Sequence, residues 1–343
     1  MLERAASWVW FGRGPLPATA RAALAPLELA YGAAVRARAA LYDRGVLASR
    51  ETAIPAVSVG NVTVGGTGKT PVAAWLASAL AARGARPAVV MRGYGADEPL
   101  VHAALNPAVP VVVAPDRVAG TARAREQGCD VAVLDDAFQH RRARRVADVV
   151  LLSADRWDGR VRLLPAGPYR EPLDALRRAS LVLVTRKAAD PARAEEAASH
   201  ARRAAPMVPI AVAHLAPGEL RSTVDGRTLP LDALRGARAL AVCAVGDPAA
   251  FLAQLRPVAG HLDAAVFPDH HAFTAEEAGA LAARAERADH VVCTLKDAVK
   301  LAAHWPRAAR PLWYVSQRVV LERGGGEVER LVASVLGARP AHS

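Results

Sequence analysis

The chain has 343 residues, 52% of them hydrophobic and 22% charged, with a formal net charge of +11 at pH 7. This length accommodates two domains, and the composition excludes a disordered chain. The charge indicates an anionic partner, which could be a nucleotide, a nucleic acid or an acidic membrane. The cysteines Cys129, Cys243 and Cys293 form no C-x-x-C pair, so neither a zinc site nor a disulfide framework is expected, and a reducing cytoplasm is the natural compartment.

The N-terminal region contains no apolar run of about 18 residues and no signal-peptide layout, so we expect no spanning helix. In residues 18–43, Leu24, Leu27 and Tyr31 recur at helical spacing. Two interpretations fit, namely a helix lying on an anionic bilayer and a helix packed on the protein with its arginines in water. The positive charges of the segment come from Arg21, Arg36, Arg38 and Arg44.

The next segment, from Val57 to Pro71, reads V-S-V-G-N-V-T-V-G-G-T-G-K-T-P. It predicts a strand over 55–60, a glycine-rich turn and a helix over 71–83, which is the order of a phosphate-binding loop. The usual pattern has glycine where this chain has Thr63. A chance glycine turn before a helix is the alternative interpretation.

The residue types in this loop suit ATP and Mg²⁺. We expect the backbone N–H groups of the turn and of the helix start to face the phosphates. Lys69 would reach the β- and γ-phosphates, and the Thr70 hydroxyl would bind Mg²⁺. In this arginine-rich chain the only lysines are Lys69, Lys187, Lys296 and Lys300, which favours a specific role for the ammonium of Lys69. The expected nucleotide-binding residues are Gly65, Gly66, Thr67, Gly68, Lys69 and Thr70.

Alternating strands and helices follow, as in a parallel sheet covered on both faces. The strand that ends at Asp135 and Asp136 predicts a magnesium site, because carboxylates at a strand end hold the metal in phosphate-loop folds. An ordinary acidic turn is the alternative. Gln139 and His140 lie just beyond, at the same sheet edge. The predicted strands are 87–91, 109–113, 131–135, 148–152 and 181–185, and the predicted helices are 116–127 and 172–179.

Three further segments follow strands and should reach the same edge, where α/β proteins bind ligands. Residues 91–99 contain Asp97 and Glu98, either of which could accept a proton from a hydroxyl, although a surface turn marked by glycine and proline is the alternative. Arg117 follows another strand. Arg170 lies in a proline-marked loop and could hold an anionic group, although a single arginine in so basic a chain is more often a surface residue.

After residue 205 the pattern changes to short linker strands and then to a second α/β series. His270 and His271 are adjacent and rarely face one ion, so a catalytic or gating role between two lobes is more plausible than metal binding. Thr294–Lys300 is a further polar cluster at the end of a predicted strand, and a helix N-terminus with solvated charges is the alternative interpretation. The predicted strands are 238–245, 262–267, 290–294, 311–316 and 318–322, and the predicted helices are 248–257, 275–287, 297–303 and 325–337.

Taken in order, these motifs resemble the tetraacyldisaccharide 4′-kinase (lipid A 4′-kinase) family. The resemblance is carried by 58–71, Arg92-Gly-Tyr94, Asp97-Glu-Pro99, Asp116-Arg117, 134–141, 163–168, 170–172, 267–270 and 294–297. The chain departs from the family pattern at Ala96 and Ala137, where glycine is usual, and at Leu295, where glutamate is usual.

The resemblance implies a P-loop kinase fold with a smaller α/β lobe joined by a two-stranded linker. It implies phosphorylation, with ATP and Mg²⁺, of the 4′-hydroxyl of an acylated glucosamine disaccharide 1-phosphate. It also implies a monotopic protein on the cytoplasmic face of the bacterial inner membrane. The expected divisions are a membrane-associating segment 1–45, a P-loop domain 46–208, linker strands 209–235, a lobe 236–316 and a return strand with a helix 317–343.

Carried over residue by residue, the resemblance makes Asp97 the base, supported by His270, with Lys69 also catalytic. Gln139 joins the nucleotide site, and Asp135 and Asp136 join Thr70 at the metal. The expected headgroup contacts are Arg92, Tyr94, Arg117 and Arg170.

Two rival functions remain open at this stage, a switch NTPase without a lipid acceptor and a soluble small-molecule kinase. The sequence shows no helix-turn-helix signature and no aromatic-rich basic strand, so we expect no nucleic-acid partner. No required protein partner is evident in the sequence.

Overall fold

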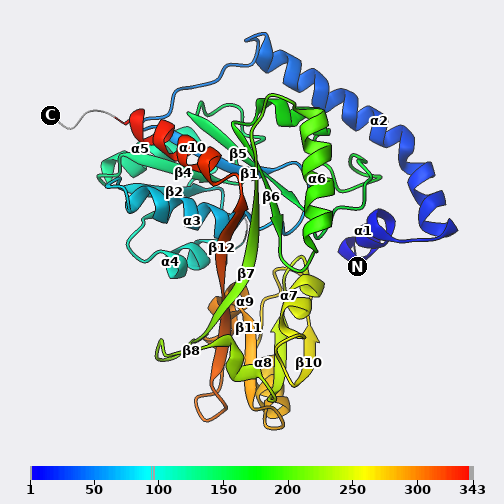
Figure 1. The fold of residues 1–343 in the computed structure, drawn as a ribbon, viewed down its shortest axis with the longest axis vertical. Coiled ribbons are helices and arrows are strands. Elements are labelled where there is room, and N and C mark those ends of the chain that lie inside the picture. Colours follow the sequence, from blue (N-terminus) through cyan, green and yellow to red (C-terminus); the bar gives the residue numbers. More distant parts are fainter. Residues whose placement is uncertain (1, 94, 96, 340–343) are drawn as a thin grey trace.

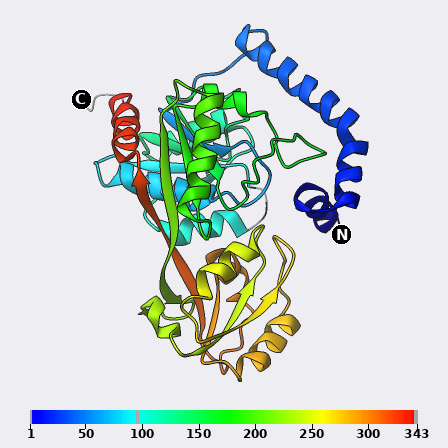
Figure 2. The same ribbon diagram turned by 45° about the vertical axis from the view of Figure 1, so that its right-hand side comes forward.

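The computed structural model describes residues 2–93, 95 and 97–339, so Tyr94 and Ala96 lie outside the described residues. One sheet runs through the whole molecule in the order β10-β9-β11-β12-β7-β6-β5-β1-β4-β2-β3, with β8 paired to β7. Figures 1 and 2 show that this sheet forms two lobes, and that two long strands, β7 and β12, join them. The expected mostly parallel α/β architecture with a second, smaller lobe is therefore confirmed.

The larger lobe is built on parallel strands with β1 near their centre, between β4 and β5. The central strands β1 and β4 are apolar runs buried on both faces, as a sheet covered by helices requires, whereas the edge strand β3 is partly exposed. The strands are β1 (Ala56–Asn61), β2 (Pro87–Met91), β3 (Val111–Val113), β4 (Val131–Asp135), β5 (Ala147–Ser153) and β6 (Leu181–Arg186). All lie where the sequence predicts strands, although β3 begins two residues later than expected.

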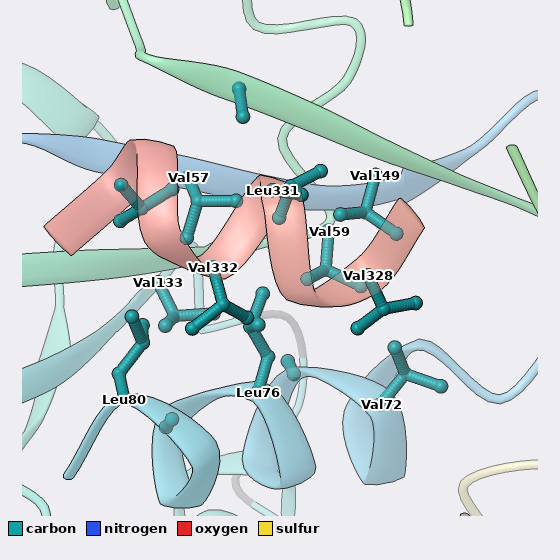
Figure 3. Close-up of a cluster of buried hydrophobic side chains, with 14 of the residues drawn as sticks. Val57, Val59, Val72, Leu76, Leu80, Val133, Val149, Val328, Leu331 and Val332 are labelled. Carbon is teal, nitrogen blue, oxygen red and sulfur yellow. The ribbon is translucent and has the colours of Figure 1, made fainter. Parts of the chain in front are cut away.

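Helices cover both faces of this sheet. Figure 3 shows α3 (Lys69–Ala81) and α10 (Gly325–Gly337) packed on one face, where Leu76 and Leu331 meet Val57 and Val59. On the other face α6 (Pro191–Ala204) packs on the alternate residues of β5 and β6, and α5 (Arg117–Glu126) packs on those of β2 and β4. The P-loop helix α3 is thus fixed by a core shared with the C-terminal helix.

The two lobes are joined by β7 (Ile210–Ser222) and β12 (Leu312–Arg323), which pair antiparallel from Trp313↔Ser222 to Arg323↔Val212. The sequence predicted 311–316 and 318–322 as separate strands. They form one strand because the pairing continues across a register shift between Val315 and Gln317, and a second shift lies between Leu321 and Arg323. The short strand β8 (Thr228–Leu229) pairs with β7.

In the smaller lobe β9 (Arg238–Cys243), β10 (His261–Val266) and β11 (His290–Thr294) run parallel to β12. Because β12 is antiparallel to β7, the carboxyl ends of these strands point toward the carboxyl ends of the larger lobe. Chain segments that follow strands in the two lobes therefore meet. The helices of this lobe are α7 (Pro248–Leu255), α8 (Ala275–Ala285), α9 (Leu295–Leu301) and the 3₁₀ helix η2 (Leu231–Leu234).

Three elements differ from expectation. Asp97 begins a helix, α4 (Asp97–Leu105), where a surface turn was the alternative. The predicted helix over 172–179 is the 3₁₀ helix η1 (Leu173–Arg178), which follows Pro172. The alanine-rich helix α6 was not among the predicted helices; Asp190 caps its start by accepting from the Arg193 amide at 2.7 Å.

At the N-terminus α1 (Leu2–Phe11) and α2 (Pro15–Asp43) form a helical pair on the outside of the larger lobe (Figure 1). The helix predicted over 18–43 is present, whereas α1 was not predicted. Arg21 was expected to add surface charge, but this prediction is wrong because Arg21 is buried. Its guanidinium donates to the Val9 carbonyl at 2.6 Å and so ties α2 to α1. Within the described residues, no helix is long and apolar enough to span a membrane.

Candidate active site

The glycine-rich loop after β1 has the conformation that a phosphate-binding loop requires. Gly65 has φ +104° and Gly68, at the start of α3, has φ +88°, both in a region that favours glycine. A Cβ at Gly68 would lie 2.3 Å from Leu215 Cδ1, so a larger residue is excluded. The loop therefore leads directly into the helix start, where unpaired N–H groups favour an anion.

The loop is held in place by its neighbours. The Asn61 amide donates to Thr67 Oγ1 at 2.8 Å, and the Thr185 hydroxyl donates to the Thr67 carbonyl at 2.9 Å. Thr63, which replaces the usual glycine, forms an isolated bridge with Tyr169. The first part of the loop is therefore extended and needs no glycine, which explains the departure from the usual pattern.

Asp135 and Asp136 lie at the end of β4, beside the loop. Asp136 is 3.8 Å from Lys69 Nζ and 2.9 Å from Arg170 Nη2. Burial alone would raise the pKa of Asp136, but the charges of Lys69 and Arg170 outweigh it and lower the pKa. The structure thus brings together the predicted phosphate lysine, one predicted metal carboxylate and the predicted headgroup arginine Arg170.

The buried carboxylate of Asp135 differs from that of Asp136. Its Oδ2 is 2.8 Å from Nε2 of the buried His102, whereas Oδ1 has no hydrogen-bond partner. No cluster of three or more His, Cys, Asp or Glu side chains suited to a metal occurs among the described residues. Mg²⁺ does not need one, since it is held by one or two carboxylates, water and substrate phosphates. The buried Asp135 Oδ1, which accepts no hydrogen bond from the described residues and lies beside the phosphate loop, is suited to bind this ion.

Gln139 faces the same strand end. Its amide donates to the Asn61 carbonyl at 2.8 Å and to Glu171 Oε1 at 3.0 Å. Arg170 also donates to the Asn61 side chain. Asn61 therefore connects the phosphate loop, Gln139 and Arg170 through hydrogen bonds.

The predicted base Asp97 and its predicted partner His270 meet across the two lobes. Asp97 Oδ1 is 3.2 Å from His270 Nδ1, and Asp97 is only 4% exposed. A Cβ at Gly95 would lie 2.7 Å from Asp97 Oδ1 and 3.2 Å from His270 Nδ1, so glycine is needed there. His270 itself has φ +58°, a strained value for a non-glycine residue that suits a functional site.

Two lysines of the smaller lobe complete this contact. Lys296 Nζ is 2.9 Å from His270 Nε2 and 3.1 Å from Asp269 Oδ1, and Lys300 Nζ is 3.9 Å from Asp97 Oδ2. At the start of α9, the alternative interpretation of solvated charges does not hold for Asp297, which is fully buried and accepts from the Ala244 amide at 3.0 Å.

The other predicted headgroup residues occupy different settings. Arg92 follows β2 and is exposed, and Tyr94 lies outside the described residues. Arg117 is buried and donates to the Ala114 and Pro115 carbonyls at 3.2 Å. Burial lowers the pKa of its guanidinium. Through these contacts Arg117 stabilises the edge of the sheet. It is also a candidate contact for an anion.

Sequence reasoning missed Asn61, His102, Glu171, Lys296 and Lys300. The scarcity of lysine could have indicated the last two. Lys69 lies at the phosphate loop, Lys296 and Lys300 lie at the Asp97–His270 contact, and Lys187 has Asp247 and Asp155 as its main charged neighbours. Three of the four lysines therefore lie at the phosphate loop or at the Asp97–His270 contact.

Comparison with known proteins agrees with this geometry. Residues 20–336 match the family model for tetraacyldisaccharide-1-P 4′-kinase. The chain belongs to this family. It is 42% identical to a tetraacyldisaccharide 4′-kinase of Anaeromyxobacter sp. (strain Fw109-5), with 88% of each chain covered. It is 41% identical to one of Halorhodospira halophila, with 92% of each covered.

A solved kinase of the tetraacyldisaccharide-1-P 4′-kinase family has the same fold. LpxK from Aquifex aeolicus, determined in complex with ATP, superposes with a TM-score of 0.71 at 28% identity. The match covers 93% of this chain and 99% of that one, so both lobes and the linker correspond.

Proposed function

We propose that this protein transfers the γ-phosphoryl group of ATP to the 4′-hydroxyl of an acylated glucosamine disaccharide 1-phosphate, a lipid A precursor. Family membership supports a kinase of this class. The observation that carries the mechanism is the contact between Asp97 and His270, which places a carboxylate and an imidazole from different lobes at the cleft beside the phosphate loop. A switch NTPase would not need such a pair.

The nucleotide would lie on the larger lobe. The backbone of Gly65, Gly66, Thr67 and Gly68 and the side chains of Lys69 and Gln139 would hold ATP. Thr70, Asp135 and Asp136 would hold Mg²⁺, which neutralises phosphate charge when bound. Asp136 is paired with Lys69 and Arg170 in the structure, so the three groups form a preassembled charged surface for the phosphates.

Asp97 would accept the proton of the acceptor hydroxyl. As the hydroxyl oxygen bonds to the γ-phosphorus, the bond from that phosphorus to the β–γ bridging oxygen breaks and ADP leaves. His270 Nδ1 would orient the Asp97 carboxylate, and Lys296 would orient the imidazole from its other side. Because Asp97 is almost completely buried, this proton transfer requires the acceptor to enter between the lobes.

The sugar and its phosphate would contact Arg92, Tyr94, Arg117 and Arg170. Of these residues, Arg92 and Arg117 follow strands of the larger lobe, and Arg170 lies in the loop near its metal carboxylates. Arg170 bonds to the Asp136 carboxylate, so an acceptor held by Arg170 would lie close to the transferred group. This proximity would position the acceptor hydroxyl.

The N-terminal segment 1–45 would associate with the anionic cytoplasmic face of the bacterial inner membrane. One face of α2 packs on the protein, where the Tyr31 hydroxyl donates to the Arg170 carbonyl at 3.0 Å. The rest of the pair leaves apolar side chains in water, which favours an interfacial helix. The exposed apolar side chains of this region are Trp8, Leu16, Leu27, Leu29 and Leu41.

The decisive experiment is transfer of labelled γ-phosphate to purified tetraacyldisaccharide 1-phosphate in detergent micelles, with and without Mg²⁺. An acceptor lacking the 4′-hydroxyl is the matched control. Magnesium-dependent labelling of the intact acceptor alone is the expected result. ATP hydrolysis without a lipid product would instead identify a switch NTPase, and labelling of water-soluble sugars would identify a soluble small-molecule kinase.

Vesicle flotation tests membrane association separately. Binding to vesicles with anionic lipid should exceed binding to neutral vesicles. Replacing Leu27 and Leu29 by Ser should weaken binding without reducing transfer to a micellar acceptor. Equal flotation of parent and variant would assign these leucines to another role.

A further inference from the structure

Arg156 lies where three parts of the molecule meet. It follows β5, and its guanidinium lies over the Phe11 ring of α1 at 5.5 Å. The guanidinium also donates to the Gly246 carbonyl, and its Nε is 3.7 Å from Asp247 of the smaller lobe. The mechanism above assigns no role to this arginine.

The guanidinium also lies against the phosphate loop itself. A Cβ built on Gly65 would be 2.7 Å from Arg156 Nη1 and 3.2 Å from its Cζ. The missing side chain of Gly65 therefore provides the space that Arg156 occupies. Since the Gly65 backbone is part of the loop that would hold ATP, the positive charge of Arg156 lies at the edge of the phosphate site.

The smaller lobe holds Arg156 in this position. A Cβ at Gly246 would lie 3.5 Å from the Gly66 amide nitrogen, so the turn after β9 lies directly over the phosphate loop. Arg156 spans this narrow gap, with its side chain 23% exposed. It also lines an open cavity of about 920 Å³ between the N-terminal helices, the loop after β5 and the start of α7.

These contacts have a chemical consequence for phosphoryl transfer. Charge spreads over the γ-phosphoryl oxygens as the bond to the bridging oxygen breaks, and an arginine at that position stabilises it in many phosphate-loop enzymes. We propose that Arg156 is a catalytic residue that contacts the γ-phosphoryl group during transfer, and that Gly246 and Asp247 aim it there. Arg156 moves no proton in this step. The inference rests on the proposed function, because it assumes ATP on the loop.

The test compares the parent with Arg156→Ala, Arg156→Lys and Arg160→Ala. Arg160 is an exposed arginine of the same loop and the matched control. Measurements are the transfer rate, the affinity for ADP, and the affinity for ADP with aluminium fluoride and Mg²⁺, which mimics the transferring group.

Arg156→Ala should slow transfer on the order of 10³-fold and weaken the fluoroaluminate complex similarly, with ADP affinity nearly unchanged. Arg156→Lys should recover part of both losses, because it keeps the charge but loses the planar fork, and Arg160→Ala should behave like the parent.

A structural role would give a different pattern. If Arg156→Ala slows transfer but binds the fluoroaluminate complex as tightly as the parent, or if it leaves transfer unchanged, the inference is overturned. Asp247→Ala keeps the guanidinium and should lose only about tenfold, roughly the worth of an aiming contact. An equal loss of transfer rate in Asp247→Ala and Arg156→Ala would mean that Arg156 only links the two lobes and does not act in transfer.

The outcome is separable from that of the proposed function. If the parent hydrolyses ATP but never labels the lipid, and Arg156→Ala slows the hydrolysis, the proposed acceptor is refuted and the role of Arg156 is supported. If the parent labels the lipid and Arg156→Ala labels it at the same rate, the proposed function is supported and the role of Arg156 is refuted.

Discussion

The two lobes are built alike but contribute to the site in different ways. Both are parallel α/β units, and the carboxyl ends of their strands point toward one another. The larger lobe acts through backbone geometry, because Gly65 and Gly68 set the path of the phosphate loop within one strand–turn–helix segment. The smaller lobe acts through a few side chains after β10 and β11, notably His270 and Lys296, whose partners lie elsewhere in the chain. The phosphate loop can therefore be recognised from a local sequence motif, whereas the side-chain contacts of the smaller lobe are apparent only in the folded structure.

The sharpest test of the larger lobe is Lys69→Ala. We expect the transfer rate to fall by roughly 10³-fold or more, because this ammonium would neutralise phosphate charge in the transition state. The circular dichroism spectrum should stay unchanged, since among the described residues the only ion pair of Lys69 is the 3.8 Å contact with Asp136. Arg83→Ala, at the other end of α3, is the control and should retain transfer. An active Lys69→Ala protein would refute the phosphate-loop assignment.

The contact between the lobes is tested by Asp97→Ala, His270→Ala and the double variant. Asp97→Ala should lower kcat by about 10²–10⁴-fold, the range for a general base, with little change in ATP affinity. His270→Ala should lose less, because it acts through Asp97. If the residues work as a unit, the double variant will lose about as much as Asp97→Ala alone. Fully additive losses would show that the lobes contribute independently.

Much of the larger lobe was predictable because its information is local. The apolar runs predicted its strands, and the segment from Gly65 to Thr70 predicted the phosphate loop. The start of α4 was not predictable, because the buried Asp97 contacts His270 and Lys300 of distant segments. The proposed domain boundaries stay a prediction, because β7 runs without a break from one lobe to the other.

The family resemblance supplied what local patterns could not, namely the pairing of Asp97 with His270. It could not place His102, whose imidazole orients Asp135 from within the core. Buried polar pairs of this kind have no periodicity or spacing, so only packing reveals them.

A smaller effect is expected from Lys296→Met, which keeps the length of the side chain and removes its charge. Without Lys296 the His270 imidazole loses the partner at its Nε2, and the Asp97 carboxylate is less well oriented. We expect kcat to fall about tenfold with KM for ATP unchanged, a loss typical of one positioning hydrogen bond. Lys296→Arg should restore part of it. A change confined to KM for ATP would place Lys296 at the nucleotide instead.

The smallest effects concern stability, where two carboxylates at the cleft should respond oppositely to pH. The pKa of Asp136 in the larger lobe is lowered by Lys69 and Arg170 against the effect of burial. Ionised Asp136 therefore stabilises the fold above its unfolded pKa near 3.8, and this stabilisation is lost as pH falls through the folded pKa. Compared with Asp136→Asn, the parent should lose its advantage in free energy of unfolding as pH falls from about 5 through the folded pKa of Asp136. Lys69→Met should diminish that trend.

The contribution of Asp297 in the smaller lobe to stability should depend on pH with the opposite sign. Burial raises its pKa, and the hydrogen bond from Thr294 and the charge of Lys300 only partly offset it. The folded state thus binds the proton more tightly than the unfolded state, so the Asp297 carboxyl costs stability once pH rises above its unfolded pKa. Relative to Asp297→Asn, the parent should gain stability as pH falls, as measured by urea unfolding without nucleotide. Parallel trends for the two aspartates would mean that the net charge of the chain, and not the local environments of the two lobes, governs its acid response.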